Sequence, residues 1–275
     1  MVTAAAAIPS RRFQYPSEFA WTLFALIFTI LTIHASYVAW IRPRGNEIVA
    51  AEQAHMKADS TYVPQRSFYL VIKDFEQEAE IIHFVWALLI IGFKAVLVQR
   101  ERKLLDRDLV HVPEGIKVLP EDAKDYARQL EALPPEDKSM LVVRALQRTL
   151  DRFAATRSIR DSAETSRVVC DSEADRLDSG LAMIRYIAWA IPAIGFIGTV
   201  RHIGDALLQA HQAVTGDITA VTSNLGIAFN ATFVALLLTI ILMFFLHQLQ
   251  QSQEKFVHDT DQWVDQRLIR HMQVR

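Results

Sequence analysis

The stretch that decides the fold is residues 191–204, Ile-Pro-Ala-Ile-Gly-Phe-Ile-Gly-Thr-Val-Arg-His-Ile-Gly. It is apolar enough to enter a membrane, yet small and polar residues gather on one face of the helix that it predicts. The residues on this face are Ala188, Pro192, Gly195, Thr199, His202 and Ala206. A helix that faces only lipid has no need of such a stripe, whereas a helix that packs closely on other helices, or borders a narrow polar path, does.

Three further stretches are apolar and long enough to cross a bilayer, which needs roughly 20 residues. Together with the opening stretch they predict spans at about 19–41, 81–98, 184–207 and 218–247. We therefore expect an all-α fold, a polytopic membrane protein with four transmembrane helices and a helical cytoplasmic insert.

The spans divide the chain into four predicted parts. These are an N-terminal segment, 1–98, with an outer segment at 42–80; a helical cytoplasmic domain, 99–182; a channel-type core, 183–249; and a C-terminal cytoplasmic amphipathic helix, 250–275. From 136 to 178 there is neither Pro nor Gly, which predicts one long, solvent-exposed helix that leads directly into the third span.

The distribution of Lys and Arg predicts the orientation. Four basic residues follow the second span within 100–107, whereas the connection 209–217 has none, and basic residues mark the cytoplasmic side. Both termini are therefore expected in the cytoplasm, in a multi-pass membrane protein. The formal net charge of −2, without a basic patch between aromatic residues, argues against nucleic acid as a partner.

The fourth span repeats the stripe of the third, with small and hydroxyl residues on one face. These are Ala228, Ala231, Thr232, Ala235 and Thr239. Arg201 and Asp205 lie four residues apart and are predicted either to pair on one helix face or to serve ion entry. No Asp or Glu falls in the middle of a predicted span, so a titrating group for a proton path would have to come from another polypeptide.

The sequence shows no enzyme motif. It contains no His-Glu-x-x-His, no phosphate-binding Gly-rich loop, and no Ser/His/Asp set in a recognisable context. We therefore expect no catalytic residues, no cofactor and no metal site.

Two of these stretches carry a family resemblance. Pro192-Ala-Ile-Gly-Phe-Ile-Gly-Thr-Val200 resembles the Pro-x-x-Gly-φ-φ-Gly-Thr-φ helix of the MotA/TolQ/ExbB proton-channel family, where φ is hydrophobic. The segment 226–236, Gly-Ile-Ala-Phe-Asn-Ala-Thr-Phe-Val-Ala-Leu, is similar to the last helix of that family. The resemblance implies a homo-oligomeric ring, a pentamer, around a single-span ExbD/TolR/MotB-like partner that bears a membrane Asp.

The resemblance also implies residue roles. Pro192 would bend the third helix, and the pore-lining residues would be Thr199, Thr232, Thr239, Gly195, Gly198, Ala228 and Ala235. The expected function is that of an ion-channel subunit, with the proton as the ion, in an energy-transducing motor. The alternative is a non-conducting oligomeric membrane scaffold that recruits partners through its cytoplasmic helices. Proton or sodium, and motility, envelope transport or defence as the driven process, all stay open.

Overall fold

The computed structural model describes residues 18–58, 67–113, 115–210 and 219–274, and within these ranges the chain is helical, with no β-strand. The elements are α1 (Glu18–Ser36), the π-helix η1 (Tyr37–Ile41), α2 (Arg42–Ala58), α3 (Phe68–Ile72), α4 (Phe75–Arg102), α5 (Ala123–Glu131), α6 (Pro135–Lys138), α7 (Leu141–Thr156), α8 (Ile159–Ser179), α9 (Ala182–Leu208), α11 (Thr219–Arg267) and the 3-10 helix η2 (Ile269–His271).

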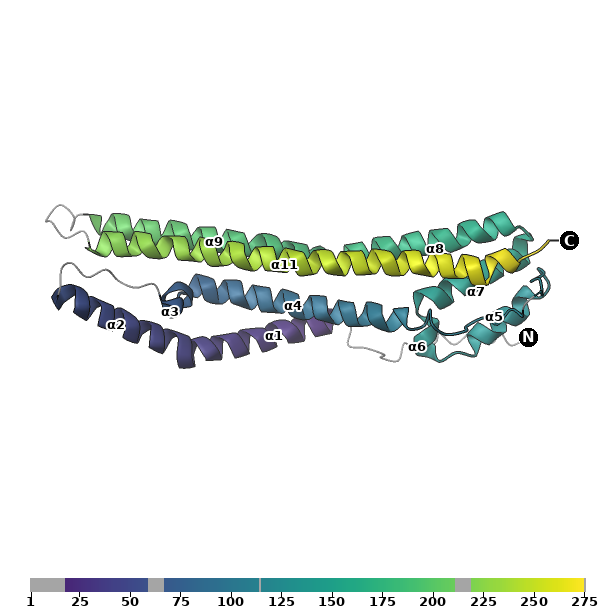
Figure 1. Ribbon diagram of the computed structural model, residues 1–275, viewed down its shortest axis with the longest axis horizontal. Coiled ribbons are helices and arrows are strands. Elements are labelled where there is room, and N and C mark those ends of the chain that lie inside the picture. The colour runs from purple at the N-terminus through teal and green to yellow at the C-terminus, as the bar shows by residue number, and fades with distance from the viewer. Residues whose placement is uncertain (1–17, 59–66, 114, 211–218, 275) are drawn as a thin grey trace, which may run out of the picture.

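The molecule is a long, narrow bundle (Figure 1). α9 and α11 run side by side, α4 lies against both, and α1 packs on α4. We call the end that holds α2 and α3 the α3 end, and the end that holds α5, α6 and α7 the α7 end. In the described residues, four helices are long and apolar enough to cross a membrane, which confirms the four spans predicted from the sequence.

An apolar core joins the membrane helices. Trp86 and Ile90 of α4, Ile184 and Ile187 of α9, and Leu242 of α11 belong to one buried cluster. Large apolar side chains remain exposed on the outside of the bundle, as expected for surfaces that lipid or other subunits cover. They include Phe24 and Phe28 on α1, Phe196 on α9, and Phe229 and Phe233 on α11.

Several helices extend beyond the spans predicted from hydropathy. α4 begins at Phe75, six residues before the predicted start of the second span. α11 continues without a break to Arg267, so the fourth span and the predicted C-terminal amphipathic helix are one helix. Its last turns pack on the rest of the chain: Phe256 is buried, and Trp263 donates a hydrogen bond from Nε1 to the Leu105 carbonyl at 2.8 Å.

The prediction of one long, exposed helix over 136–178 was wrong. The segment forms α6, α7 and α8, and the break between α7 and α8 falls at Arg157. Arg157 has a φ of 52°, in the left-handed region that ends helices, and Ser158 caps α8 by accepting a hydrogen bond from the Asp161 amide at 3.2 Å. Neither Gly nor Pro marks this break, which is why composition missed it.

α7 is a core helix of the α7 end rather than a solvated one. Leu146, Leu150 and Phe153 are buried in a cluster that also contains Leu130 of α5 and Val264 of α11. The last turn of α11 therefore anchors the extramembrane helices to the membrane bundle.

Candidate functional site: the junction of α4, α9 and α11

Thr199 and Thr232 bring two hydroxyl groups together between α9 and α11. The Oγ1 atoms lie 2.6 Å apart. Thr199 Oγ1 also lies 2.9 Å from the Ala228 carbonyl oxygen, and Thr232 Oγ1 lies 3.1 Å from the Gly195 carbonyl oxygen. Both threonines are half-buried.

A hydroxyl both donates and accepts, so this chain of oxygens has two orientations. In one, Thr232 donates to Thr199, which donates to the Ala228 carbonyl. In the other, Thr199 donates to Thr232, which donates to the Gly195 carbonyl. Reversal needs only rotation of the two hydroxyl hydrogens.

Thr239 behaves differently from the other two threonines of the predicted lining. Its hydroxyl donates to the Ala235 carbonyl of its own helix at 2.8 Å, the usual arrangement of a helical threonine. Ala228 and Ala235 are fully buried. Pro192 lies inside α9, which continues through it.

Gly195 and Gly198 allow a very close approach of α9 to α11. A Cβ atom on Gly195 would lie 2.5 Å from the Ala235 Cβ, and one on Gly198 would lie 2.8 Å from the Ala231 Cβ. Real Cβ atoms essentially never come this close, so the small residues of the two stripes face each other inside one protomer. A pore-lining role for Gly195, Gly198, Ala228 and Ala235 stays a prediction.

The same two glycines also accommodate glutamates of α4. The Glu80 Oε1 lies 3.2 Å from the position of a Cβ on Gly195, and the Glu76 Cγ lies 2.8 Å from that of a Cβ on Gly198. Glu76 and Glu80 are four residues apart and share a face of α4. The Gly-x-x-Gly spacing of α9 therefore matches two acidic side chains one turn apart on α4.

Glu76 forms an ion pair with Arg201. Arg201 Nε lies 2.6 Å from Glu76 Oε1, and Arg201 Nη2 lies 2.8 Å from Glu76 Oε2. The two contacts together make the ion pair bidentate. The sequence predicted that Arg201 either pairs with Asp205 or serves ion entry; the structure instead gives Arg201 a carboxylate partner on α4. Arg201 therefore pairs with a carboxylate of another helix, which contacts the Nε and Nη2 side of its guanidinium, rather than with Asp205 four residues along its own helix.

The first turns of α4 hold four carboxyl groups, and three of them face cations or histidines. Glu76 faces Arg201, as above. Glu78 accepts from Arg42, and one of its oxygens lies 2.7 Å from His34 Nδ1. Asp74 has an oxygen 4.0 Å from His202 Nε2.

Glu80 is the exception. It is 0% exposed, and neither of its carboxyl oxygens has a hydrogen-bond partner among the described residues. The neighbouring Gln77 is likewise 0% exposed with both amide atoms unpartnered.

Two ion pairs bracket an apolar layer of membrane thickness. Near the α7 end, Lys94 Nζ lies 2.9 Å from a Glu18 oxygen. From Lys94 to Glu76, α4 rises about 27 Å, close to the roughly 30 Å of a hydrocarbon core. Glu80 lies about 6 Å inside the Glu76 level, or one helical turn. Glu80 therefore lies near one end of the α4 span, and the middle of the span carries no Asp or Glu, in line with the sequence.

Sequence reasoning missed Glu80 because the hydropathic run begins at Ile81. A signal was present: Glu76 and Glu80 lie at helical spacing and lead into the apolar run without a Gly or Pro between. The ion-pair partner of Glu76 could not be inferred, since Arg201 comes from α9 and lies 125 residues away.

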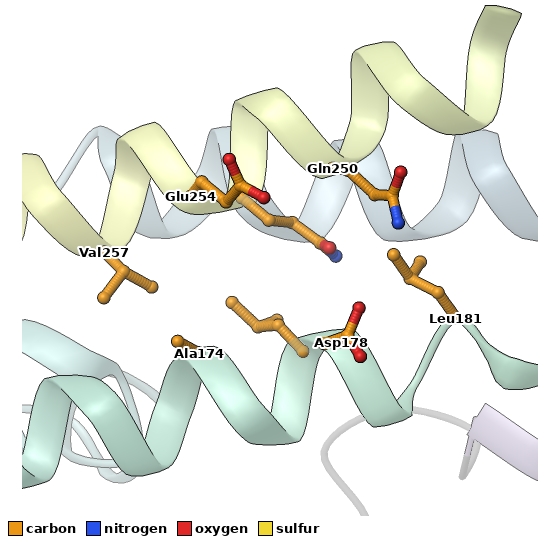
Figure 2. A pocket seen from close by; sticks show the side chains of 8 residues that line it. Ala174, Asp178, Leu181, Gln250, Glu254 and Val257 are labelled. Carbon is orange, nitrogen blue, oxygen red and sulfur yellow. The ribbon is translucent and has the colours of Figure 1, made fainter.

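A small pocket lies between α8 and α11, on the α7 side of the junction (Figure 2). Asp178 and Leu181 line it from one side, and Gln250 and Glu254 line it from α11. Its volume is about 40 Å³. This volume is close to the roughly 30 Å³ that one water molecule occupies in the liquid. It is far below the roughly 300 Å³ of the smallest sites for small molecules.

Comparison with known families agrees with the geometry. Residues 138–262 match the family model described as the MotA/TolQ/ExbB proton channel family. No curated protein and no solved structure shows significant similarity to the chain. The matched region contains α7, α8, α9 and the threonine pair. Residues 138–262 of this membrane protein therefore belong to the MotA/TolQ/ExbB proton channel family.

Proposed function

We propose that this protein is the channel subunit of an ion-driven energy transducer, with the proton as the ion. In this proposal several copies, a pentamer, form a ring around a single-span ExbD/TolR/MotB-like partner, whose membrane Asp takes up and releases the ion. The observation that carries the proposal is the Thr199–Thr232 hydroxyl pair, which bridges α9 and α11 within the family region.

The chemistry of the pair supports this role. Polar groups within a membrane layer are costly unless they are satisfied, and they mark ion and proton paths. The two hydroxyls are satisfied by each other and by backbone carbonyls, yet they stay half-buried and so keep acceptor capacity for a water molecule or a partner carboxyl. Because its hydrogen bonds can reverse, the pair can orient a water molecule or a partner carboxyl that supplies or accepts the proton.

The exposed surface supports an oligomer. α9 and α11 expose large apolar side chains along their lengths, among them Phe196, Ile197, Phe229, Phe233 and Leu236. The small residues that would allow close helix contact point inward in the protomer, so bulky side chains form the outer contact surface. Copies of this chain, together with lipid, would cover that surface.

The distribution of basic residues supports the orientation. Arg100, Arg102 and Lys103 end α4 at the α7 end, so we place this end and both termini in the cytoplasm, in a multi-pass protein of the bacterial inner membrane. The ion would then cross between the α3 end and the α7 end, past the threonine pair.

Ion flux in proteoliposomes tests the proposal. The complex is isolated from native membranes through a tag on this chain, so that associated proteins accompany it, and its single-span components are identified. In Thr199→Val and Thr232→Val, flux should fall about ten-fold or more, because valine keeps the shape but removes the hydroxyl. Thr22→Val is the matched control, since the Thr22 hydroxyl bonds the Glu18 carbonyl of its own helix, at 2.7 Å.

Wild-type flux in both threonine variants would overturn the pore assignment. That outcome would leave the scaffold alternative, in which the small faces only pack helices. The scaffold predicts in addition that Gly195→Leu, which would push α9 and α11 apart within each protomer, disperses the oligomer while the threonine variants assemble normally.

A further inference from the structure

The chain itself supplies a carboxyl group to the junction. Glu80 lies where α4, α9 and α11 meet, with its Oε1 3.2 Å from the position of a Cβ on Gly195. A Cβ on Gly195 would also lie 3.1 Å from the Ala231 carbonyl oxygen of α11, so the carboxyl group lies beside the position where the backbones of α9 and α11 approach each other. The side chain is fully buried and both its oxygens lack partners among the described residues.

The surroundings of Glu80 favour a protonated carboxyl. An ionised carboxylate in a buried site costs several kcal/mol unless it is paired, so an unpaired group holds its proton. The cations of this region are engaged by other carboxylates: Arg201 by Glu76, and Arg42 by Glu78. His202 of α9 faces Asp74, and His34 of α1 faces Glu78. From Leu225 to Leu246, α11 contributes no charged residue at all.

Glu80 and the threonine pair meet the same residue from opposite directions. Cα–Cβ bonds of a helix tilt toward its N-terminus, whereas carbonyl groups point toward its C-terminus. Glu80 therefore lies on the Cβ side of Gly195, toward the α7 end, and Thr199 and Thr232 contact the Gly195 carbonyl on the other side. The carboxyl group and the two hydroxyls thus lie on opposite sides of Gly195 along the axis of α9.

We infer that Glu80 is a proton-binding site of this protein, which exchanges a proton with the path through Thr199 and Thr232 while ions flow. This inference rests on the proposed function. The inference changes one part of the proposed function. Besides the partner's Asp, each subunit of the ring carries a titrating group of its own, Glu80. Glycine at position 195 is then required both for helix packing and for access of the Glu80 carboxyl.

Infrared spectroscopy of the purified complex tests the protonated state without any flux. The wild-type protein should show the carbonyl stretch of a neutral carboxylic acid at neutral pH, and the band should shift on exchange into heavy water. Glu80→Gln should weaken this band, to which the partner's Asp can also contribute, and Glu47→Gln, which alters an exposed glutamate of α2, should leave its intensity unchanged. A wild-type spectrum identical to that of Glu80→Gln would overturn the inference.

Flux measurements then test the functional role. Glu80→Gln is nearly isosteric with the neutral acid, so the variant should fold and assemble as the wild type does, while flux falls about ten-fold or more. Glu80→Asp should recover part of the flux, because it restores a titrating group.

The two proposals fail in different ways. A wild-type complex without flux refutes the proposed function. Full flux in Glu80→Gln, in a preparation where Thr199→Val loses it, refutes the role of Glu80 and leaves the channel standing.

Discussion

Replacing Gly195 with alanine should loosen the contact between α9 and α11. The added Cβ would lie 2.5 Å from the Ala235 Cβ, almost 1 Å short of the 3.4 Å at which ordinary contact begins. Its other near neighbours are the Ala231 carbonyl and the Glu80 carboxyl, at 3.1 Å and 3.2 Å. Two of these three atoms are fixed to helix backbones, so a side-chain rotation cannot relieve the clash and the helices must separate.

The magnitude follows from two opposing effects. Overpacking of a tight site costs about 1–3 kcal/mol, and the lack of a flexible neighbour places Gly195→Ala near the upper end. Replacing a glycine in a helix interior by alanine stabilises the helix by about 1 kcal/mol. We therefore expect a net loss of about 2 kcal/mol in the free energy of unfolding.

Gly92 and Gly204 provide matched controls. A Cβ at either position meets nothing within 4 Å, so the alanine variants should gain up to about 1 kcal/mol. Unfolding by SDS in mild detergent, followed by far-UV circular dichroism, measures all three. Ala235→Gly in the Gly195→Ala background removes the clashing atom and should recover part of the loss. If Gly195→Ala unfolds at the same SDS concentration as Gly204→Ala, the close approach of α9 and α11 is not real.

Three further predictions concern the ion pair and the extramembrane helices. Phe153→Ala should lower the free energy of unfolding by about 3–5 kcal/mol, because Phe153 is fully buried in the α7-end core. Val168→Ala, at an exposed position of α8, should change it by less than about 0.5 kcal/mol. Equal losses in the same unfolding assay would contradict a buried α7. Glu76→Gln and Arg201→Gln should each lower the free energy of unfolding by about 1–2 kcal/mol. The double variant should lose little more stability than either single variant, because both substitutions remove the same ion pair. Strictly additive losses in this double-mutant cycle would count against the pair. Ser158→Ala should cost about 1 kcal/mol through loss of the α8 cap, and Ser158→Asp should retain the stability; a thermal midpoint unchanged in Ser158→Ala would argue against a helix start at this residue.

The membrane architecture could be predicted from the sequence because hydrophobicity is a local property. The apolar runs that contain Ile90, Ile191 and Leu242 identify their own spans without reference to other residues. The stripes with Thr199 and Thr232 are equally local, since helical spacing alone places their members on one face. The resemblance of residues 138–262 to the MotA/TolQ/ExbB proton channel family includes the same residues.

The helix limits at the α7 end were less predictable. Nothing in the residue types near Arg157 requires a left-handed backbone, so the α7–α8 break depends on how α7 packs against α5 and α11. Similarly, α4 starts at Phe75 rather than Ile81, and two glutamates in its first turns, Glu76 and Glu78, are paired with Arg201 and Arg42 from other helices.

The sequence by itself determined that this chain crosses a membrane four times with helices, and that two of those helices carry small and hydroxyl residues on one face. Periodicity and hydropathy depend only on residues close together in the sequence, so both can be read without knowledge of the tertiary structure. Only the tertiary structure decided what those faces meet. In the folded protein the glycines of α9 pack against alanines of α11, and Thr199 is hydrogen-bonded to Thr232. Arg201 forms its ion pair with Glu76 instead of Asp205. The tertiary structure also leaves Glu80 buried without a partner among the described residues. These outcomes depend on contacts between residues 33 to 125 positions apart, and the spacing along one helix does not contain that information.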